Sequence, residues 1–150
     1  MDPIKSKKQQ SDKLLFFGVM LFFLGLVVGL FIPMMANPRM GLSSHLEGVL
    51  NGIFLIALGL IWDKLELSKG WLSATYWLSL FGTFANWFAV LTAAVFNSGK
   101  MMPLAAGKEG NPAAEGIVTF LLVTLSIAML ATCIMAMTGL LKHINARNDG

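Results

Sequence analysis

The sequence is poor in charged residues: only 13% of its 150 residues are Asp, Glu, Lys or Arg, whereas 56% are hydrophobic. An average soluble domain carries about 25% charged residues, so this chain has too few to cover a water-exposed globule of its size. The charges are also segregated, with long apolar runs between them. The composition therefore excludes a soluble fold and predicts an integral membrane protein.

Cysteine and histidine are also scarce. The one cysteine, Cys133, lies inside the last apolar run, so the chain has no intramolecular disulfide and no Cys-x-x-Cys-His motif for covalent haem attachment. The only histidines are His45 and His143. The net charge of +3 follows from the lysines that flank the apolar runs, and we interpret it as a sign of membrane topology. No nucleic-acid partner is expected.

Four segments are long and apolar enough to cross a bilayer, which requires about 20 residues in a helix. They lie at approximately 14–35, 46–62, 71–96 and 116–141. The first run exceeds the core of a secretory signal, so we interpret it as a retained helix. The predicted fold is all-α: a single four-helix membrane domain that covers residues 1–150.

Lys and Arg are divided unequally between the two ends of the predicted bundle. The end that holds both termini carries eight of them: Lys5, Lys7, Lys8, Lys13, Lys64, Lys69, Lys142 and Arg147. The opposite end carries three: Arg39, Lys100 and Lys108. The positive-inside rule therefore predicts a multi-pass protein of the bacterial inner membrane with both termini in the cytoplasm. Trp62, Trp71 and Trp77 are expected to form an aromatic belt at the cytoplasmic interface.

The second span begins with polar groups that hydrocarbon solvates poorly, namely His45, Glu47 and Asn51. Ionisable residues within a span are rare and indicate function by default. At helical spacing His45, Gly48 and Gly52 share one sector, with Asn51 at its edge and Glu47 just beyond, so this face offers a ligand and room for a flat cofactor. The alternative is structural: His45 caps carbonyls at the interface, and Glu47 lies in the first turn, where the helix dipole favours a carboxylate.

The third span carries an amide, Asn86, near its middle, followed by Trp87 and Phe88. A buried amide needs a partner inside the bundle, so Asn86 either joins two helices or faces a substrate cavity. Small-residue pairs at Gly25-x-x-x-Gly29 and Gly48-x-x-x-Gly52 predict close helix approach, within one chain or between chains.

The stretch NPRMGLSSHLEGVLNG, residues 37–52, together with the four-span frame, resembles the hydroxylaminobenzene mutases, which are small bacterial membrane enzymes. More distantly, it is similar to styrene oxide isomerase, whose second span also has a histidine six residues before an asparagine that is followed by glycine. The corresponding residues here are His45, Asn51 and Gly52.

The resemblance implies a non-covalent haem b whose iron is bound by His45, in a homotrimer with haem near the subunit interfaces. It places Gly48 and Gly52 beside the cofactor and Asn51 over the open face of the iron. From its charge alone, Arg39 is a candidate partner for a haem propionate.

The resemblance also favours rearrangement of an aryl hydroxylamine over isomerisation of an epoxide. Epoxide isomerases supply a carboxylate and a tyrosine from the third span, and alignment on Asn86 places Gly82 and Val90 at those positions. An isomerase that converts an aryl hydroxylamine into an aminophenol is therefore expected, with haem iron as a Lewis acid. Glu47, Asn51 and Asn86 are the predicted catalytic groups.

On this hypothesis of an aryl hydroxylamine isomerase, a small aromatic substrate would lie between Trp87 and Phe88. Three alternatives remain open: a styrene-oxide-type epoxide isomerase, a non-catalytic haem protein that carries electrons, and a small transporter. An electron carrier usually binds haem through two histidines, and His143 follows the last span at the opposite end from His45.

Overall fold

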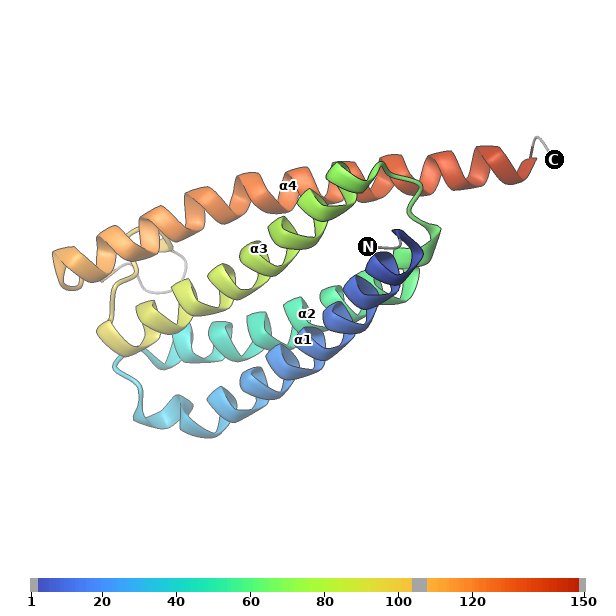
Figure 1. Ribbon diagram of the computed structural model, residues 1–150. Helices are drawn as coiled ribbons and strands as arrows, with labels where there is room; N and C mark the ends of the chain where they lie inside the picture. Colours follow the sequence, from blue (N-terminus) through green and yellow to red (C-terminus); the bar gives the residue numbers. More distant parts are fainter. Residues whose placement is uncertain (1–2, 104–107, 149–150) are drawn as a thin grey trace.

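The computed structural model describes residues 3–103 and 108–148, with side chains from Ser6 onward, so the Lys5 side chain of the topology count lies outside the described part. The four long helices are α1 (Pro3–Phe31), α2 (Pro38–Ile61), α3 (Lys69–Phe96) and α4 (Pro112–Asn148) (Figure 1). The short 3-10 helices η1 (Ile32–Met34) and η2 (Trp62–Lys64) follow α1 and α2. The described residues contain no strand, and all four long helices are apolar enough to cross a membrane. The predicted all-α, four-span fold is confirmed, and the chain is a multi-pass membrane protein.

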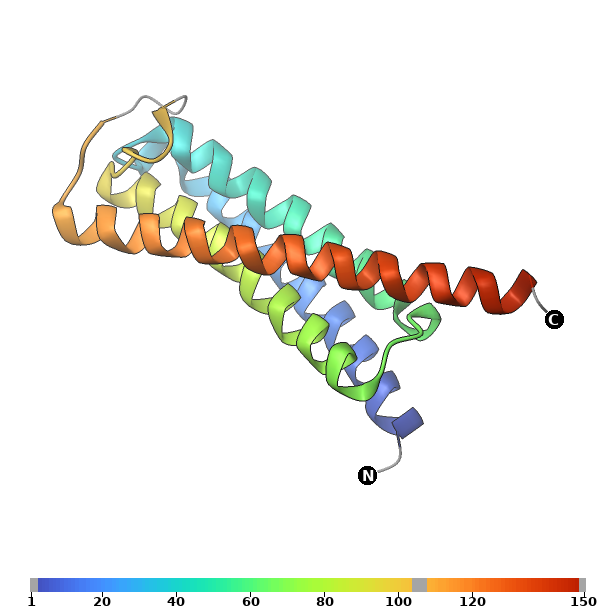
Figure 2. The ribbon, with the colours of Figure 1, turned by 90° about the horizontal axis from the view of Figure 1, so that it is seen from above.

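Each helix packs mainly on its neighbour in the chain, α1 on α2, α2 on α3 and α3 on α4, and α1 also touches α3. Both termini lie at the same end of the bundle (Figures 1 and 2). Because α4 covers α3 and not α1 or α2, the bundle is open along one side.

The start of α2 differs from the prediction. The helix begins at Pro38 and not near residue 46, because the side chain of Asn37 accepts a hydrogen bond from the backbone N–H of Met40 at 3.2 Å and Pro38 occupies the first helical position. His45 and Glu47 therefore lie in the third turn. The expectation that Glu47 sits in the first turn, held by the helix dipole, is wrong.

Glycines bring α1 and α2 into backbone contact. A Cβ atom on Gly48 would lie 2.5 Å from the Cα atom of Gly25, and one on Gly52 would lie 2.6 Å from the backbone nitrogen of Phe22. Gly18 of α1 meets α2 in the same way, with a Cβ 2.8 Å from the Gly52 carbonyl oxygen. The small-residue spacing therefore joins two helices of the same chain.

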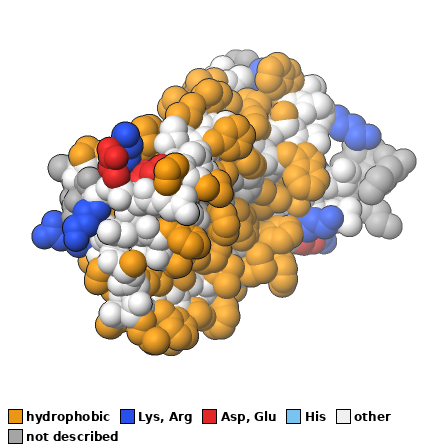
Figure 3. Space-filling model, turned by 90° about the vertical axis from the view of Figure 1, so that its left-hand side faces the viewer, with side chains coloured by type: hydrophobic (Ala, Val, Ile, Leu, Met, Phe, Trp, Pro, Cys, Tyr) orange, Lys and Arg blue, Asp and Glu red, His pale blue; other side chains and the backbone are white. Residues whose placement is uncertain are grey.

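The outer surface is apolar, as expected of a membrane protein. Figure 3 views the bundle from the end opposite the termini: hydrophobic side chains form large patches over its centre and lower part, and the few charges lie toward its margins. One side of α1 exposes a stripe at helical spacing, namely Phe16, Val19, Phe23, Leu26 and Leu30. This stripe is a surface for lipid or for another protein chain.

The predicted aromatic belt is only partly present. Trp71 and Trp77 are exposed, but Trp62 is fully buried, with its ring edge-on to Tyr76 and its indole N–H 3.4 Å from the Gln10 side-chain oxygen. The prediction for Trp62 is therefore wrong: at this end α1 continues past the predicted span and covers it.

We expect Gly52→Ala to destabilise the protein, because the added methyl group would collide with the α1 backbone. The expected loss is about 1–3 kcal/mol of unfolding free energy, the usual cost of overpacking. Thermal unfolding in detergent, followed by circular dichroism, measures the effect.

The matched control is Gly116→Ala in α4, where an added Cβ has no neighbouring atom within 4 Å. Here alanine should be neutral or stabilising, because glycine weakens a helix interior. Equal unfolding temperatures for the two variants would contradict the proposed packing role of Gly52.

Candidate functional site

The His45 side chain is held against α1 by one hydrogen bond. Its Nδ1 lies 2.8 Å from the backbone carbonyl oxygen of Gly25. Because a carbonyl oxygen only accepts, Nδ1 carries the proton and Nε2 is the basic nitrogen. Within the described residues Nε2 has no hydrogen-bond partner. A ring fixed in this way is typical of a histidine that binds a metal through its other nitrogen.

Gly29 makes room for this ring. A Cβ atom at Gly29 would lie 2.8 Å from His45 Nδ1 and 3.2 Å from its Cε1. Sequence reasoning assigned Gly25 and Gly29 to helix packing alone and missed both roles toward His45. The Gly-x-x-x-Gly spacing was the available signal, but it does not tell which side chain will lie against it.

The second polar group joins α2 to α3. Glu47 Oε2 accepts a hydrogen bond from the Asn51 side-chain amide at 3.0 Å and another from the Asn86 amide at 2.5 Å. The structure therefore brings together the three residues that were predicted to act in catalysis. We call Glu47, Asn51 and Asn86 the carboxylate–amide cluster.

His45 and the cluster lie on different sides of α2. His45 bonds to α1, whereas Glu47 and Asn51 bond to each other and to α3. The helical wheel placed Asn51 at the edge of the His45 sector, but its hydrogen bond turns it toward Glu47. Within one chain, Asn51 does not stand beside the imidazole.

Gly48 and Gly52 do not provide open space for a cofactor. Both face α1, whose backbone fills the volume beside them, and Trp87 Cδ1 would lie 3.1 Å from a Cβ atom on Gly48. The room that the sequence predicted at these two glycines is therefore occupied by the α1 backbone and the Trp87 side chain, and the ligand role of His45 stays a prediction.

Two buried polar atoms near these groups have no hydrogen-bond partner among the described residues: Ser44 Oγ and the Trp87 indole nitrogen. Such atoms are rare in proteins and often mark a site for a ligand or water. Trp87 packs on α2 beside the cluster, whereas Phe88 is 52% exposed on the outer face of α3. The two rings predicted to flank a substrate therefore point to different sides of the helix.

Arg39 lies near the N-terminus of α2, at the same end of the bundle as His45. Its side chain is exposed and lines a hollow of about 210 Å³ together with Asn37, Asn97 and Lys108. Its side chain makes no hydrogen bond or ion pair with the described residues, so its charge is available to an anionic group.

The described part of the chain holds no cluster of three or more His, Cys, Asp or Glu side chains that could bind a metal ion by themselves. His143 Nδ1 lies within hydrogen-bond distance of Glu66 Oε1, at 3.0 Å, near the end that holds the termini and well away from His45. A bis-histidine site within one chain therefore does not form.

Comparison with known proteins places this arrangement in a family. Residues 10–141 match the family model for styrene oxide isomerase. The chain is 51% identical over 140 residues to hydroxylaminobenzene mutase HabB of Ectopseudomonas oleovorans, covering 92% of this chain and 85% of that protein. It is 48% identical over 127 residues to hydroxylaminobenzene mutase HabA of the same organism, covering 83% and 94%. No solved structure matches the chain.

The family match over residues 10–141 covers nearly the whole bundle and spans the positions of His45 and the carboxylate–amide cluster. The matches confirm the resemblance seen in residues 37–52, and the names of the two relatives, both mutases, establish the reaction class as isomerisation. The chain belongs to the styrene oxide isomerase family and is a membrane isomerase.

Proposed function

We propose that the protein rearranges an aryl hydroxylamine, such as hydroxylaminobenzene, to an aminophenol. Two relatives at about half identity carry that substrate in their names. The observation that carries the proposal is the carboxylate–amide cluster, a Glu47 carboxylate held by two amides within the membrane-spanning part of the bundle. An ionisable side chain within a membrane span is energetically unfavourable, so its presence indicates a functional role by default.

The cluster suits the polar end of this substrate. Glu47 Oε1 and the amide oxygens of Asn51 and Asn86 have no hydrogen-bond partners within the described residues, so the cluster offers acceptors to the N–H and O–H groups of a hydroxylamine. The buried indole N–H of Trp87 can donate to the substrate oxygen.

The overall reaction is redox-neutral, since the N–O bond breaks, a ring C–O bond forms, and one proton moves from the ring carbon to nitrogen. No nicotinamide or other electron donor is needed. A base within hydrogen-bond reach of the ring can take that proton and return it to nitrogen. Glu47 is the only carboxylate of the cluster, and we assign it this role.

The residues present fit the haem b that the family resemblance implies. His45 has its Nδ1 proton committed to Gly25 and its Nε2 lone pair free, which is the state in which a histidine would bind iron. Arg39 would supply a cation for a propionate. When bound, haem iron supplies a Lewis acid for the nitrogen or oxygen of the substrate. Glu47, Asn51 and Asn86 would orient the substrate and hold the proton.

The third span argues for the hydroxylamine over an epoxide. Gly82 packs against Met129 of α4, and Val90 is buried among apolar side chains, so the positions that carry a carboxylate and a tyrosine in epoxide isomerases supply no polar group here. The only tyrosine, Tyr76, is near the other end of α3.

We also propose that the active unit is a homotrimer with haem near the subunit interfaces. The separation of His45 from the cluster supports a shared site, because a flat cofactor on His45 of one subunit can then face the cluster of its neighbour. The open side of the bundle leaves surface for such a neighbour.

For localisation, we propose the bacterial inner membrane with both termini in the cytoplasm. The lysines near the termini and in the connection after α2 support this orientation, because they lie at the same end of the bundle (Figure 1).

His45→Ala should remove the Soret absorption band from protein purified from haem-replete cells, because the iron loses its ligand. Added imidazole should restore the band by occupying the vacated position, which separates loss of the ligand from loss of the fold. The measurement is an absorption spectrum before and after imidazole.

His143→Ala is the matched control and should keep the band, since His143 pairs with Glu66 at the other end of the bundle. A colourless wild-type protein would remove haem from the mechanism and leave His45 as a packing group.

Glu47→Gln should lower kcat for phenylhydroxylamine by about 100-fold or more, the usual contribution of a positioned acid–base group. The Soret band should stay unchanged, because Glu47 does not touch His45. Product formation followed by chromatography gives the rate.

Glu66→Gln, which removes a carboxylate at the exposed end of the bundle, should keep full activity. If Glu47→Gln turns over at the wild-type rate, Glu47 has no part in proton transfer.

Co-expression of His45→Ala and Glu47→Gln chains, each with a different tag, tests the shared site. If His45 of one subunit acts with Glu47 of the next, mixed oligomers contain intact sites and should recover activity that neither variant shows alone. Mixed oligomers that stay as inactive as their parents would mean that each site is formed by a single chain.

A further inference from the structure

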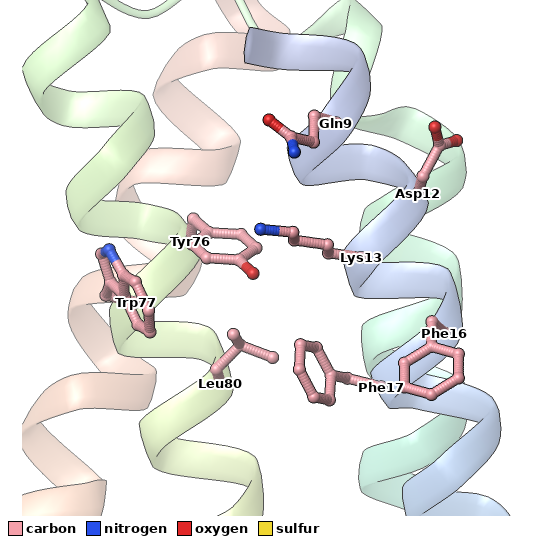
Figure 4. Close-up of a pocket in the computed structure, with 8 residues that line it drawn as sticks. All are labelled: Gln9, Asp12, Lys13, Phe16, Phe17, Tyr76, Trp77 and Leu80. Carbon is pink, nitrogen blue, oxygen red and sulfur yellow. The ribbon is translucent and has the colours of Figure 1, made fainter.

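A groove opens between α1 and α3, near the end of the bundle that holds both termini. Its volume is about 480 Å³. Phe16 and Phe17 of α1 line one wall, and Tyr76, Trp77 and Leu80 of α3 line the other (Figure 4). Lys13 lies about 18 Å along α1 from Gly25, the residue that holds His45, at 1.5 Å per residue. None of the residues that line the groove is His45 or a member of the carboxylate–amide cluster.

The groove lies where the charged end of the bundle meets the apolar band. Lys13 is the last charged residue of α1, and Lys69 is the only one of α3. Trp77 lines the groove and is 65% exposed. Lysine, tryptophan and tyrosine together at such a boundary are typical of the headgroup level of a bilayer.

One end of the groove is lined by both Lys13 and Asp12, which form no ion pair with each other. In Figure 4 the Lys13 side chain extends across the gap toward Tyr76, while the Asp12 carboxylate points away from it. Neither Lys13 nor the Tyr76 hydroxyl hydrogen-bonds to the described residues. Lys7, by contrast, donates to the carbonyl oxygens of Asp63 and Leu65.

A second, more polar hollow lies about one helical turn closer to the N-terminal ends of α1 and α3. Its volume is about 200 Å³, and Gln10, Lys69 and Ser73 are among the residues that line it. The seam between α1 and α3 thus runs from apolar and aromatic walls to a cationic and hydroxyl-bearing end. This order matches an acyl chain followed by a phosphate headgroup.

We propose that this seam binds one anionic phospholipid, with its phosphate at Lys13 and Tyr76 and one acyl chain along Phe16, Phe17 and Leu80. A neutral aromatic substrate would use the apolar walls but has no need of the lysine. The lysine selects for negative charge, because a basic group near the membrane surface attracts anionic lipid.

The test is native mass spectrometry of the full-length protein from micelles that contain equal amounts of phosphatidylglycerol and phosphatidylcholine with the same acyl chains. Wild type should retain phosphatidylglycerol preferentially. Lys13→Gln should lower that preference about fivefold, the contribution of one lysine near anionic lipid. Leu80→Trp, which fills the apolar part, should lower retention of both lipids.

Lys64→Gln is the matched control, because it removes the same charge at the same end of the bundle but does not line the groove. The proposal is overturned if Lys64→Gln lowers the preference as much as Lys13→Gln, or if wild type shows no preference. It is also overturned if excess phenylhydroxylamine displaces the bound lipid, since the groove would then be a substrate site. The measurement needs neither haem nor turnover, so it stands apart from the mutase proposal.

Discussion

The backbone contact between α1 and α2 determines where His45 lies. At Gly25 and Gly48 the two helices approach so closely that neither position has space for a Cβ atom. This proximity brings the Gly25 carbonyl oxygen within 2.8 Å of His45 Nδ1, and the missing side chain of Gly29 leaves the place that the ring occupies. The same glycines thus bring the helices together, position the imidazole and fix its tautomer. A helix carbonyl can accept this second hydrogen bond because it has two lone pairs.

The carboxylate–amide cluster illustrates how a membrane protein keeps an ionisable group without an opposite charge. No cation among the described residues bonds to Glu47; two amide donors do, one from its own helix and one from α3. Breaking either bond leaves a polar group unpaired in an environment without water to replace it. The cluster therefore also fixes α3 relative to α2, and part of the stability of the bundle rests on the residues that we assign to catalysis.

The sequence predicted the four-helix fold because long apolar runs are a strong signal, and it identified Glu47, Asn51 and Asn86 because polar groups in such runs are rare. It misplaced the start of α2, although Asn37-Pro38 is the same cap-and-proline signal that begins α4 at Asn111-Pro112. Which faces of the helices meet could not be predicted, because glycine spacing does not reveal its partner. Trp62 and Gly48 were misinterpreted for that reason: burial and open space depend on the neighbouring helix.

His45 and the carboxylate–amide cluster lie on different sides of α2 in a bundle that is open along one side. A single chain places its basic imidazole nitrogen on the α1 side of α2 and its proton-holding cluster on the α3 side, with His45 and Glu47 about 160° apart around the helix at 100° per residue. Chemistry that needs both groups at one substrate cannot use them within one chain unless α2 rotates, and rotation would break the contacts at Gly25, Gly48 and Asn86. The shared site proposed above would supply the same juxtaposition without moving any helix, because His45 and Glu47 would then come from different chains. Under the proposed shared site, oligomerisation would be part of how the active site forms.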